Sequence, residues 1–281
     1  MRNALALGGQ WHCGKGGCPP VPSPVIPARS LPGPWVFIPT RELAGGFGRH
    51  PGKGGLPMSC TWVIDYRGYF VMVIELANSM KNECFILSHV MEIGIQSIMM
   101  NLPSDLKKVV MPLKFSMALR NKEPVTRFNK SNRLDRKDMI MFPVLENIDK
   151  SKPIMSNHYW VFNVNLRDRR FEVLDSWRTL DKKTLDTCAR SMVASVRALW
   201  ETHYPKSHIS MDNFPLAKID VPKQTNEFDY GVFSLTLANG WDASIVPRLT
   251  VGDVPNIRRP LTNTWVNTKN NKAPWKDVKL A

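Results

Sequence analysis

From Thr61 onward, apolar and polar residues alternate with the periods of regular secondary structure. Within residues 84–100, apolar side chains recur three and four positions apart, at Ile86, Val90 and Ile93 among others, which predicts an amphipathic helix whose methionines fill the core. The run DMIMFPV at 138–144 is short and apolar. It predicts a strand that is closed by its proline.

A hairpin is predicted in the middle of the chain. The segment HYWVFNVNL (158–166) alternates apolar and more polar residues, which is typical of a half-buried strand. The charged stretch RDRR (167–170) then forms a turn, and FEVLDS (171–176) returns as the partner strand. The two ends of this hairpin, at residues 158 and 175, are therefore expected to lie side by side.

Two further helices are predicted after the hairpin. Residues 181–204 place one set of side chains on a single helical face: Leu185, Cys188, Met192, Val196 and Leu199. The segment DYGVFSLTLANG predicts a helix from about Gly231 that Gly240 closes, as the last ordered unit of the chain. Strands followed by helices, with a hairpin between them, indicate an α+β fold.

Composition divides the chain into three parts. Twelve of the 17 glycines and ten of the 22 prolines lie before Cys60, so residues 1–60 are expected to be a disordered Gly/Pro-rich segment. Residues 61–260 form the predicted domain, and residues 261–281 a basic tail. His12, Cys13 and Cys18 hint at zinc but lack a second ligand pair, so we expect neither a metal nor a cofactor.

Charge and cysteine content narrow the class of protein. The formal charge of +14 permits non-specific contact with nucleic acid, with a local cluster at 127–137, but no recognition motif accompanies it. No apolar run is long enough to span a membrane. Five scattered cysteines suit a reducing nuclear or cytoplasmic compartment, between which the sequence does not choose.

The hairpin brings candidate catalytic groups together. His158 begins one strand and Asp175 ends its partner, so the imidazole and the carboxylate can meet. A carboxylate there would orient a histidine that activates a nucleophile, and the nucleophile belongs at a helix N-terminus, where the helix dipole stabilises a thiolate. Gln224 could donate to an oxyanion. Each residue alone also has an ordinary structural interpretation, including Asp229 as a helix N-cap.

The combination resembles a known family. The tripeptide His-Tyr-Trp at a strand start, Asp-Ser after a hairpin, and the segment QTNEFDYGVF are similar to motifs of the ubiquitin-like-protein-specific proteases, which are SUMO-processing, adenain-related cysteine proteases. The likeness covers roughly residues 84–245 and is strongest to plant members, many of them carried by transposable elements. It implies a papain-like fold with a central mixed sheet flanked by helices, nuclear residence, and a ubiquitin-like modifier as partner, cleaved after Gly-Gly.

The same resemblance assigns roles to residues. His158 corresponds to the general base, Asp175 to its orienter and Gln224 to the oxyanion donor, while Tyr230 occupies the position of the nucleophilic cysteine. Tyr159 and Trp160 correspond to substrate-binding residues, although the family usually has tryptophan directly after the histidine. In this chain, either Tyr159 takes that tryptophan's place over the substrate tunnel or the strand shifts locally.

Three hypotheses follow from Tyr230. The chain is a pseudoenzyme, because a phenol ionises near pH 10 and is far bulkier than a thiol; or it is an active cysteine protease whose recorded residue 230 is a sequencing or gene-model error. Alternatively, it is a basic nucleic-acid-associated protein of mobile-element origin that uses the fold as a scaffold. Cys188 is not expected to replace the nucleophile, because it lies on the buried face of its helix.

Overall fold

The computed structural model describes residues 61–277 apart from 104, 124–127, 129 and 149–156. These residues belong to one compact unit, residues 40–281. The predictions made for residues 1–60, including the Gly/Pro-rich segment and the weak zinc pattern, lie outside the described residues. Within the described part, no helix combines the length and the apolar character that crossing a membrane requires.

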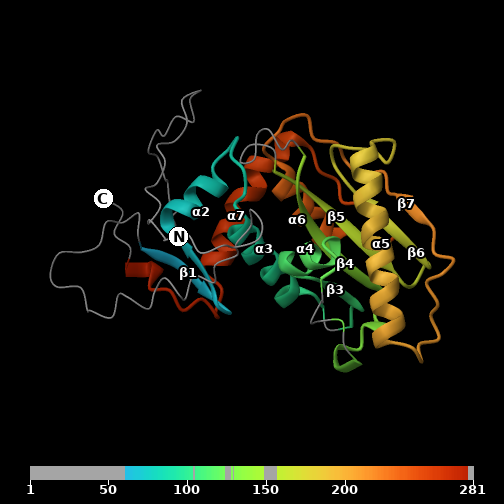
Figure 1. Ribbon diagram of the computed structural model, residues 1–281. Helices are drawn as coiled ribbons and strands as arrows, with labels where there is room; N and C mark the ends of the chain where they lie inside the picture. The colour runs from blue at the N-terminus through green and yellow to red at the C-terminus, as the bar shows by residue number, and fades with distance from the viewer. Residues whose placement is uncertain (1–60, 104, 124–127, 129, 149–156, 278–281) are drawn as a thin grey trace, which may run out of the picture. The chain divides into compact units, whose positions relative to one another are not determined.

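Helices and strands are interspersed along the described chain (Figure 1). The strands are β1 (Trp62–Tyr66), β2 (Tyr69–Met72), β3 (Lys108–Val110), β4 (Met139–Asn147), β5 (Asn157–Asn165), β6 (Arg170–Leu174) and β7 (Leu216–Lys218). The α-helices are α2 (Val73–Met80), α3 (Ser88–Asn101), α4 (Leu113–Arg120), α5 (Lys183–His203), α6 (Tyr230–Gly240) and α7 (Val254–Val266). The expected order of strands followed by helices is wrong, because α2, α3 and α4 all precede β4.

A five-stranded mixed sheet with the order β3-β4-β5-β6-β7 forms the centre of the fold. The inner pairs β4–β5 and β5–β6 are antiparallel, while both edge strands run parallel to their neighbours. The predicted hairpin is β5–β6, with bounds within one or two residues of those expected. The α+β fold with a central mixed sheet and flanking helices is therefore confirmed.

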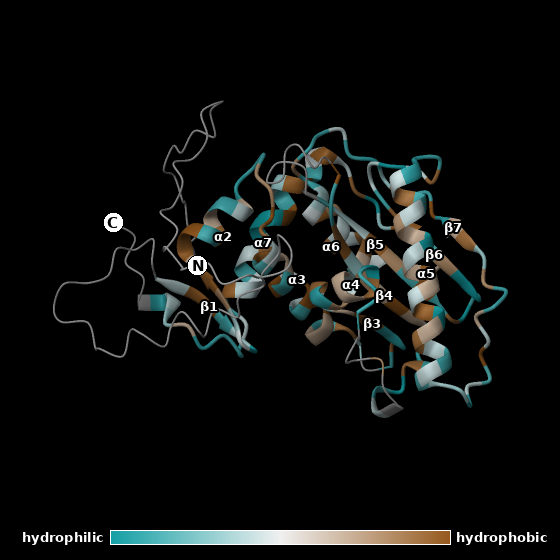
Figure 2. Cartoon of the chain, viewed as in Figure 1, coloured by the Kyte–Doolittle hydropathy of each residue, from teal (hydrophilic) through white to brown (hydrophobic). Residues whose placement is uncertain are grey.

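Helices cover both faces of this sheet. One hydrophobic core packs α3, α6 and α7 against sheet residues such as Met141 and Val161, and the other packs α4 and α5 against Phe142 and Phe162. Polar and apolar residues alternate along α5, which matches a helix with one face toward the sheet (Figure 2). Neighbouring residues of a strand therefore enter different cores.

Two predictions about strands are wrong. β5 is not half-buried, because even Asn163 and Asn165 are fully buried. β4 does not end at Pro143 but continues to Asn147. The carbonyl of Met141 faces β3 and accepts a hydrogen bond from the backbone N–H of Met111. Pro143, two residues later, directs its nitrogen to the same side, but β3 has already ended at Val110. No ladder hydrogen bond is lost there.

Helix ends also differ from the sequence-based expectation. The first predicted helix begins at Ser88 rather than near residue 84, and Leu87 before it is exposed. The helix that starts at Tyr230 ends at Gly240 as predicted. It is not the last ordered unit, because α7 follows and crosses the boundary expected at residue 260, with Trp265 and Val266 buried. The sequence of α7 is largely polar and few of its residues are buried, so its pattern did not predict a helix.

A buried arginine holds α7 against the rest of the fold. Arg258 is only 1% exposed, and its guanidinium donates to the carbonyls of Ser79 and Cys84 and to the carboxylate of Asp229 at 2.8 Å. Asp229 stands at the N-cap position of α6, but its side chain makes no capping bond to the helix. The expected N-cap residue instead fixes the start of α6 to α7 through a buried ion pair.

Replacing Arg258 by methionine is expected to destabilise the fold strongly. It leaves the buried Asp229 carboxylate without its cation, and losing one partner of such a pair costs about 3–5 kcal/mol. The matched control is Arg259→Met on the same helix, where the side chain is exposed and the expected change is within about 0.5 kcal/mol. Urea unfolding of both variants measures the difference. Similar losses for the two would contradict the structural role of Arg258.

Candidate active site

His158 and Asp175 meet at the end of the central sheet. The Nε2 atom of His158 donates to Oδ1 of Asp175 at 3.0 Å, and neither side chain is exposed. His158 lies in β5, and Asp175 comes directly after β6, so the antiparallel register places the two side chains diagonally on one face. The contact expected from the hairpin is confirmed.

The Asp175 carboxylate accepts four hydrogen bonds. Besides His158, its Oδ1 receives the backbone N–H groups of Trp177 and Arg178, and its Oδ2 receives Nε of Arg178 at 3.0 Å. Burial by itself raises the pKa of a carboxyl, but here the hydrogen bond from His158 and the nearby cations hold the pKa of Asp175 well below its usual value. Asp175 is therefore both a turn residue and the partner of His158.

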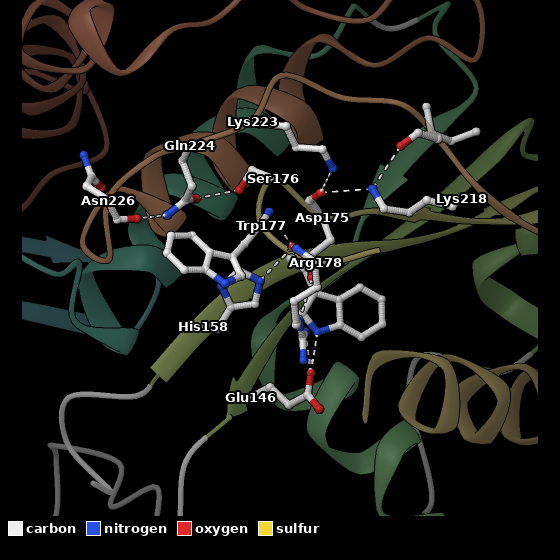
Figure 3. A network of polar contacts seen from close by, with 12 residues as sticks. Glu146, His158, Asp175, Ser176, Trp177, Arg178, Lys218, Lys223, Gln224 and Asn226 are labelled. Atoms are coloured by element: carbon white, nitrogen blue, oxygen red, sulfur yellow. Dashed lines mark hydrogen bonds and ion pairs between the residues drawn. The ribbon is translucent and has the colours of Figure 1, made fainter. Parts of the chain in front are cut away.

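The network continues to a second carboxylate on β4. Arg178 donates from Nη2 to Glu146 at 2.8 Å, and Trp160 donates its indole N–H to the same carboxylate oxygen at 2.9 Å. Figure 3 shows Arg178 between Asp175 and Glu146, with His158 on the other side of Asp175. Arg178 and Glu146 were not among the residues predicted from the sequence. The position of Arg178, three residues after Asp175, was a weak signal, whereas nothing in the sequence marked Glu146.

Tyr230 lies against His158 at the first residue of α6. Their ring centroids are 4.3 Å apart with an interplanar angle of 81°, and Tyr230 is 4% exposed. Burial, together with the nearby acids Glu227 and Asp175, raises the pKa of Tyr230 to about 12. The other ring nitrogen of His158, Nδ1, is buried and has no hydrogen-bond partner among the described residues. A neutral phenol ring thus packs beside the imidazole at the helix N-terminus.

Close packing fixes the start of α6 in this place. A Cβ atom on Gly231 would stand 2.9 Å from the side chain of Ile86, so only glycine fits there without a shift. The carbonyl of Ile86 in turn accepts the hydroxyl of Tyr159 at 3.1 Å. The segment before α3 therefore packs between β5 and the first turn of α6.

Gln224 is held by residues on both sides of it. Its Oε1 accepts the hydroxyl of Ser176 at 2.6 Å, and its Nε2 donates to the carbonyl of Asn226 at 2.7 Å. Asn226 donates to the carboxylate of Asp229, which leads to Arg258. Figure 3 shows Gln224 reaching Ser176, the residue that follows Asp175. This chain of hydrogen bonds orients the amide beside the His158–Asp175 pair.

The two predicted substrate-binding aromatics are both buried. Trp160 is fully buried on the α5 side of the sheet, and Tyr159 is 4% exposed in the opposite core. Neither offers surface to a ligand in this structure, and regular strand alternation, not a local shift, separates them. The exposed aromatic of the site is Trp177, which is 40% exposed and packs edge-on against Tyr230 at 5.7 Å. Trp177 was not among the predicted site residues, although it directly follows Asp175 and Ser176.

Cys188 does not stand where a nucleophile beside His158 is expected. It is buried within α5 rather than at a helix start, and burial, with a contribution from Glu146, raises the pKa of its thiol to about 12. No contact between Cys188 and His158 is present in the described part of the chain. The residues described also contain no cluster of three or more histidine, cysteine or acidic side chains that could hold a metal.

The chain is similar to several known proteins. The family model of the Ulp1 protease family, C-terminal catalytic domain, matches residues 104–265. Ubiquitin-like-specific protease 1A of Arabidopsis thaliana is 30% identical over 107 residues, which are 38% of this chain and only 20% of that protein.

Solved structures show the same fold. The SUMO protease Ulp1 with its catalytic cysteine oxidized to a sulfenic acid matches with a TM-score of 0.60 at 17% identity, over 73% of this chain and 88% of that one. The Ulp1 protease domain in complex with Smt3, the yeast ortholog of SUMO, matches with a TM-score of 0.60 at 14% identity, over 85% and 98%. The Ulp1-like SUMO protease domain of Chaetomium thermophilum gives 0.53 at 18% identity, over 74% and 83%.

Replacing Asp175 by asparagine is expected to destabilise the fold in a pH-dependent way. Because the folded-state pKa lies below the unfolded value, the carboxylate contributes stability above about pH 4, and this contribution is lost as the pH falls further. The free energy of unfolding should therefore drop by about 3 kcal/mol or more at pH 7. The difference between the two proteins should narrow by about 1 kcal/mol at pH 3.

Urea unfolding at both pH values measures this difference. The control is Asp212→Asn, at an exposed carboxylate, which should change stability little at either pH. A deficit for Asp175→Asn that is equal at pH 7 and pH 3 would show that the charge of Asp175 does not stabilise the fold.

Proposed function

The chain belongs to the Ulp1 protease family, and we propose that it is a pseudoprotease: it keeps the fold, the base and the base's partner but lacks a nucleophile. The observation that carries this proposal is the contact between Tyr230 and His158. In this position a cysteine protease needs a thiolate that attacks the carbonyl carbon and forms a thioester.

A phenol at residue 230 is unsuited to that step. The pKa of Tyr230, raised to about 12, keeps the oxygen protonated at neutral pH, whereas a thiol at a helix N-terminus ionises readily. The ring also occupies buried space between His158 and Trp177. The proposed roles are then a base for His158, its orienting partner for Asp175 and an oxyanion donor for Gln224. On this proposal, no nucleophile is present for them to act on.

The partner of this fold is proposed to be a ubiquitin-like modifier of the SUMO type, or its conjugates. Two findings support this choice: the solved relative in complex with Smt3, and the curated plant relative whose name is ubiquitin-like-specific protease. Trp177 is exposed and packs against Tyr230. We expect it to contact the C-terminal end of such a modifier. Binding without cleavage is the expected activity.

The alternative, a nucleic-acid-associated protein, receives less support from the described surface. Arg133, within the basic cluster at 127–137, is paired with Asp135, and the turn at 167–170 places Asp168 beside both Arg167 and Arg170. Asp135 reduces the positive charge of the cluster at 127–137, and Asp168 does the same for the charged turn at 167–170. Only overall charge favours this function.

The purified chain is expected to show no isopeptidase activity, and Tyr230→Cys is expected to restore a trace of it. The thiol would stand at the start of α6 beside His158, and removing the ring would open space for a Gly-Gly tail. The measurement is covalent capture by a ubiquitin-like modifier that carries an electrophile at its C-terminus. Capture should occur with Tyr230→Cys and not with the unchanged protein.

Two controls separate space from chemistry. Tyr230→Ala opens the same space without a thiol and should not be captured, and Tyr230→Cys combined with His158→Ala should react far more slowly than Tyr230→Cys alone. Capture of the unchanged protein at Cys188 would place the nucleophile elsewhere. Cleavage of a modifier conjugate by the unchanged protein would refute the pseudoprotease proposal.

A further inference from the structure

Two lysine side chains converge on one backbone carbonyl behind the His158–Asp175 pair. Lys218, the last residue of β7, donates from Nζ to the carbonyls of Asp175 and Ile219, both at 3.0 Å. Lys223 donates from Nζ to the same carbonyl of Asp175 at 3.2 Å. Figure 3 shows the two chains approaching this oxygen from different sides. The role proposed above for the site uses neither amine.

Two ammonium groups on one oxygen repel each other. A neighbouring cation and partial removal from water both favour the neutral form of an amine. Lys218 is half-buried and Lys223 is exposed, so burial disfavours the protonated form mainly at Lys218. Burial and Lys223 accordingly lower the pKa of Lys218 to about 8, against the opposing effects of Asp175 and Asp220. At pH 7.5 about a quarter of Lys218 is therefore an unprotonated amine, against roughly a thousandth for an ordinary lysine.

We propose that Lys218 is an acyl-acceptor site that takes acyl groups from acyl thioesters. The site stands on the edge strand of the sheet, where Lys218 is partly open to solvent. Lys223 acts as a positioning residue, because its ammonium group shares the acceptor and increases the fraction of Lys218 that is neutral. This site is independent of Tyr230 and of any peptidase activity.

The chemistry of the step is balanced with the thioester as co-reactant. The lone pair of the neutral Nζ atom attacks the thioester carbonyl, a C–N bond forms, and the C–S bond breaks. The thiolate leaves and is protonated, while the amine loses one proton to water. The product is an uncharged amide at Lys218, so one of the two cationic donors to the carbonyl of Asp175 is removed.

A third lysine shows why low basicity alone is insufficient. Burial lowers the pKa of Lys108 to about 8 as well, but Lys108 is only 3% exposed and donates to the carbonyls of Asn239 and Trp241 at the end of α6. A thioester cannot reach it in the folded chain. Lys108 therefore serves as an internal control in which the amine is weakly basic but enclosed.

The test measures acetylation of each lysine in the full chain by a small acetyl thioester, between pH 7 and pH 10, with quantification by mass spectrometry after digestion. At pH 7.5, Lys218 should react about tenfold faster than exposed Lys183, because the larger fraction of free amine outweighs its lower intrinsic nucleophilicity. Its rate should level off above about pH 8, whereas that of Lys183 should keep rising. Lys108 should stay unmodified.

Substitutions identify the cause of the reactivity. Lys223→Gln should slow the reaction of Lys218 at pH 7.5 severalfold and move its pH midpoint upward, while Lys183→Gln should leave both unchanged. Circular dichroism confirms that each variant is folded. The proposal is overturned if Lys218 reacts no faster than Lys183 at pH 7.5, or if Lys223→Gln leaves its rate and pH profile unaltered.

Discussion

The buried carboxylate of Asp175 is the constraint on which the arrangement of the site depends. It is fully buried, and it remains charged because four hydrogen bonds and the guanidinium of Arg178 compensate the loss of water. Those donors come from β5 and from the turn after β6, and Arg178 extends the network to Glu146 on β4. The carboxylate of Asp175 thus links the ends of three adjacent strands. Its hydrogen bond to His158, which orients the imidazole, is one of these links.

On the proposed function, this double role explains how the His158–Asp175 pair can persist beside a residue that does not act as a nucleophile. Removing His158 or Asp175 would leave buried polar groups without partners, which is costly whether or not the protein catalyses a reaction. Tyr230, by contrast, fills space next to the pair with an aromatic ring and leaves the bond between His158 and Asp175 intact. Stability therefore favours keeping His158 and Asp175 together, whereas a thiol at residue 230 would be kept only for activity.

The cover of helices on both faces of the sheet sets what each strand residue can do. Along β5, His158 and Trp160 share one face, and Tyr159 enters the core on the other, where its hydroxyl reaches Ile86. Two of the residues expected to contact substrate are for this reason parts of the interior. Trp177 lies outside the strand, in the turn after Asp175, and is free of this restriction.

Local pattern in the sequence was enough for the hairpin, the helix at Tyr230, and the meeting of His158 with Asp175, because each depends on strand alternation, helical spacing or a short turn. Tertiary structure decided what depends on distant partners. The two-sided burial of β5, the continuation of β4 through Pro143, and the pairing of Arg258 with Asp229 all arise from segments far apart in the chain. The convergence of Lys218 and Lys223 on Asp175 is of the same kind, since a backbone carbonyl leaves no mark in the sequence.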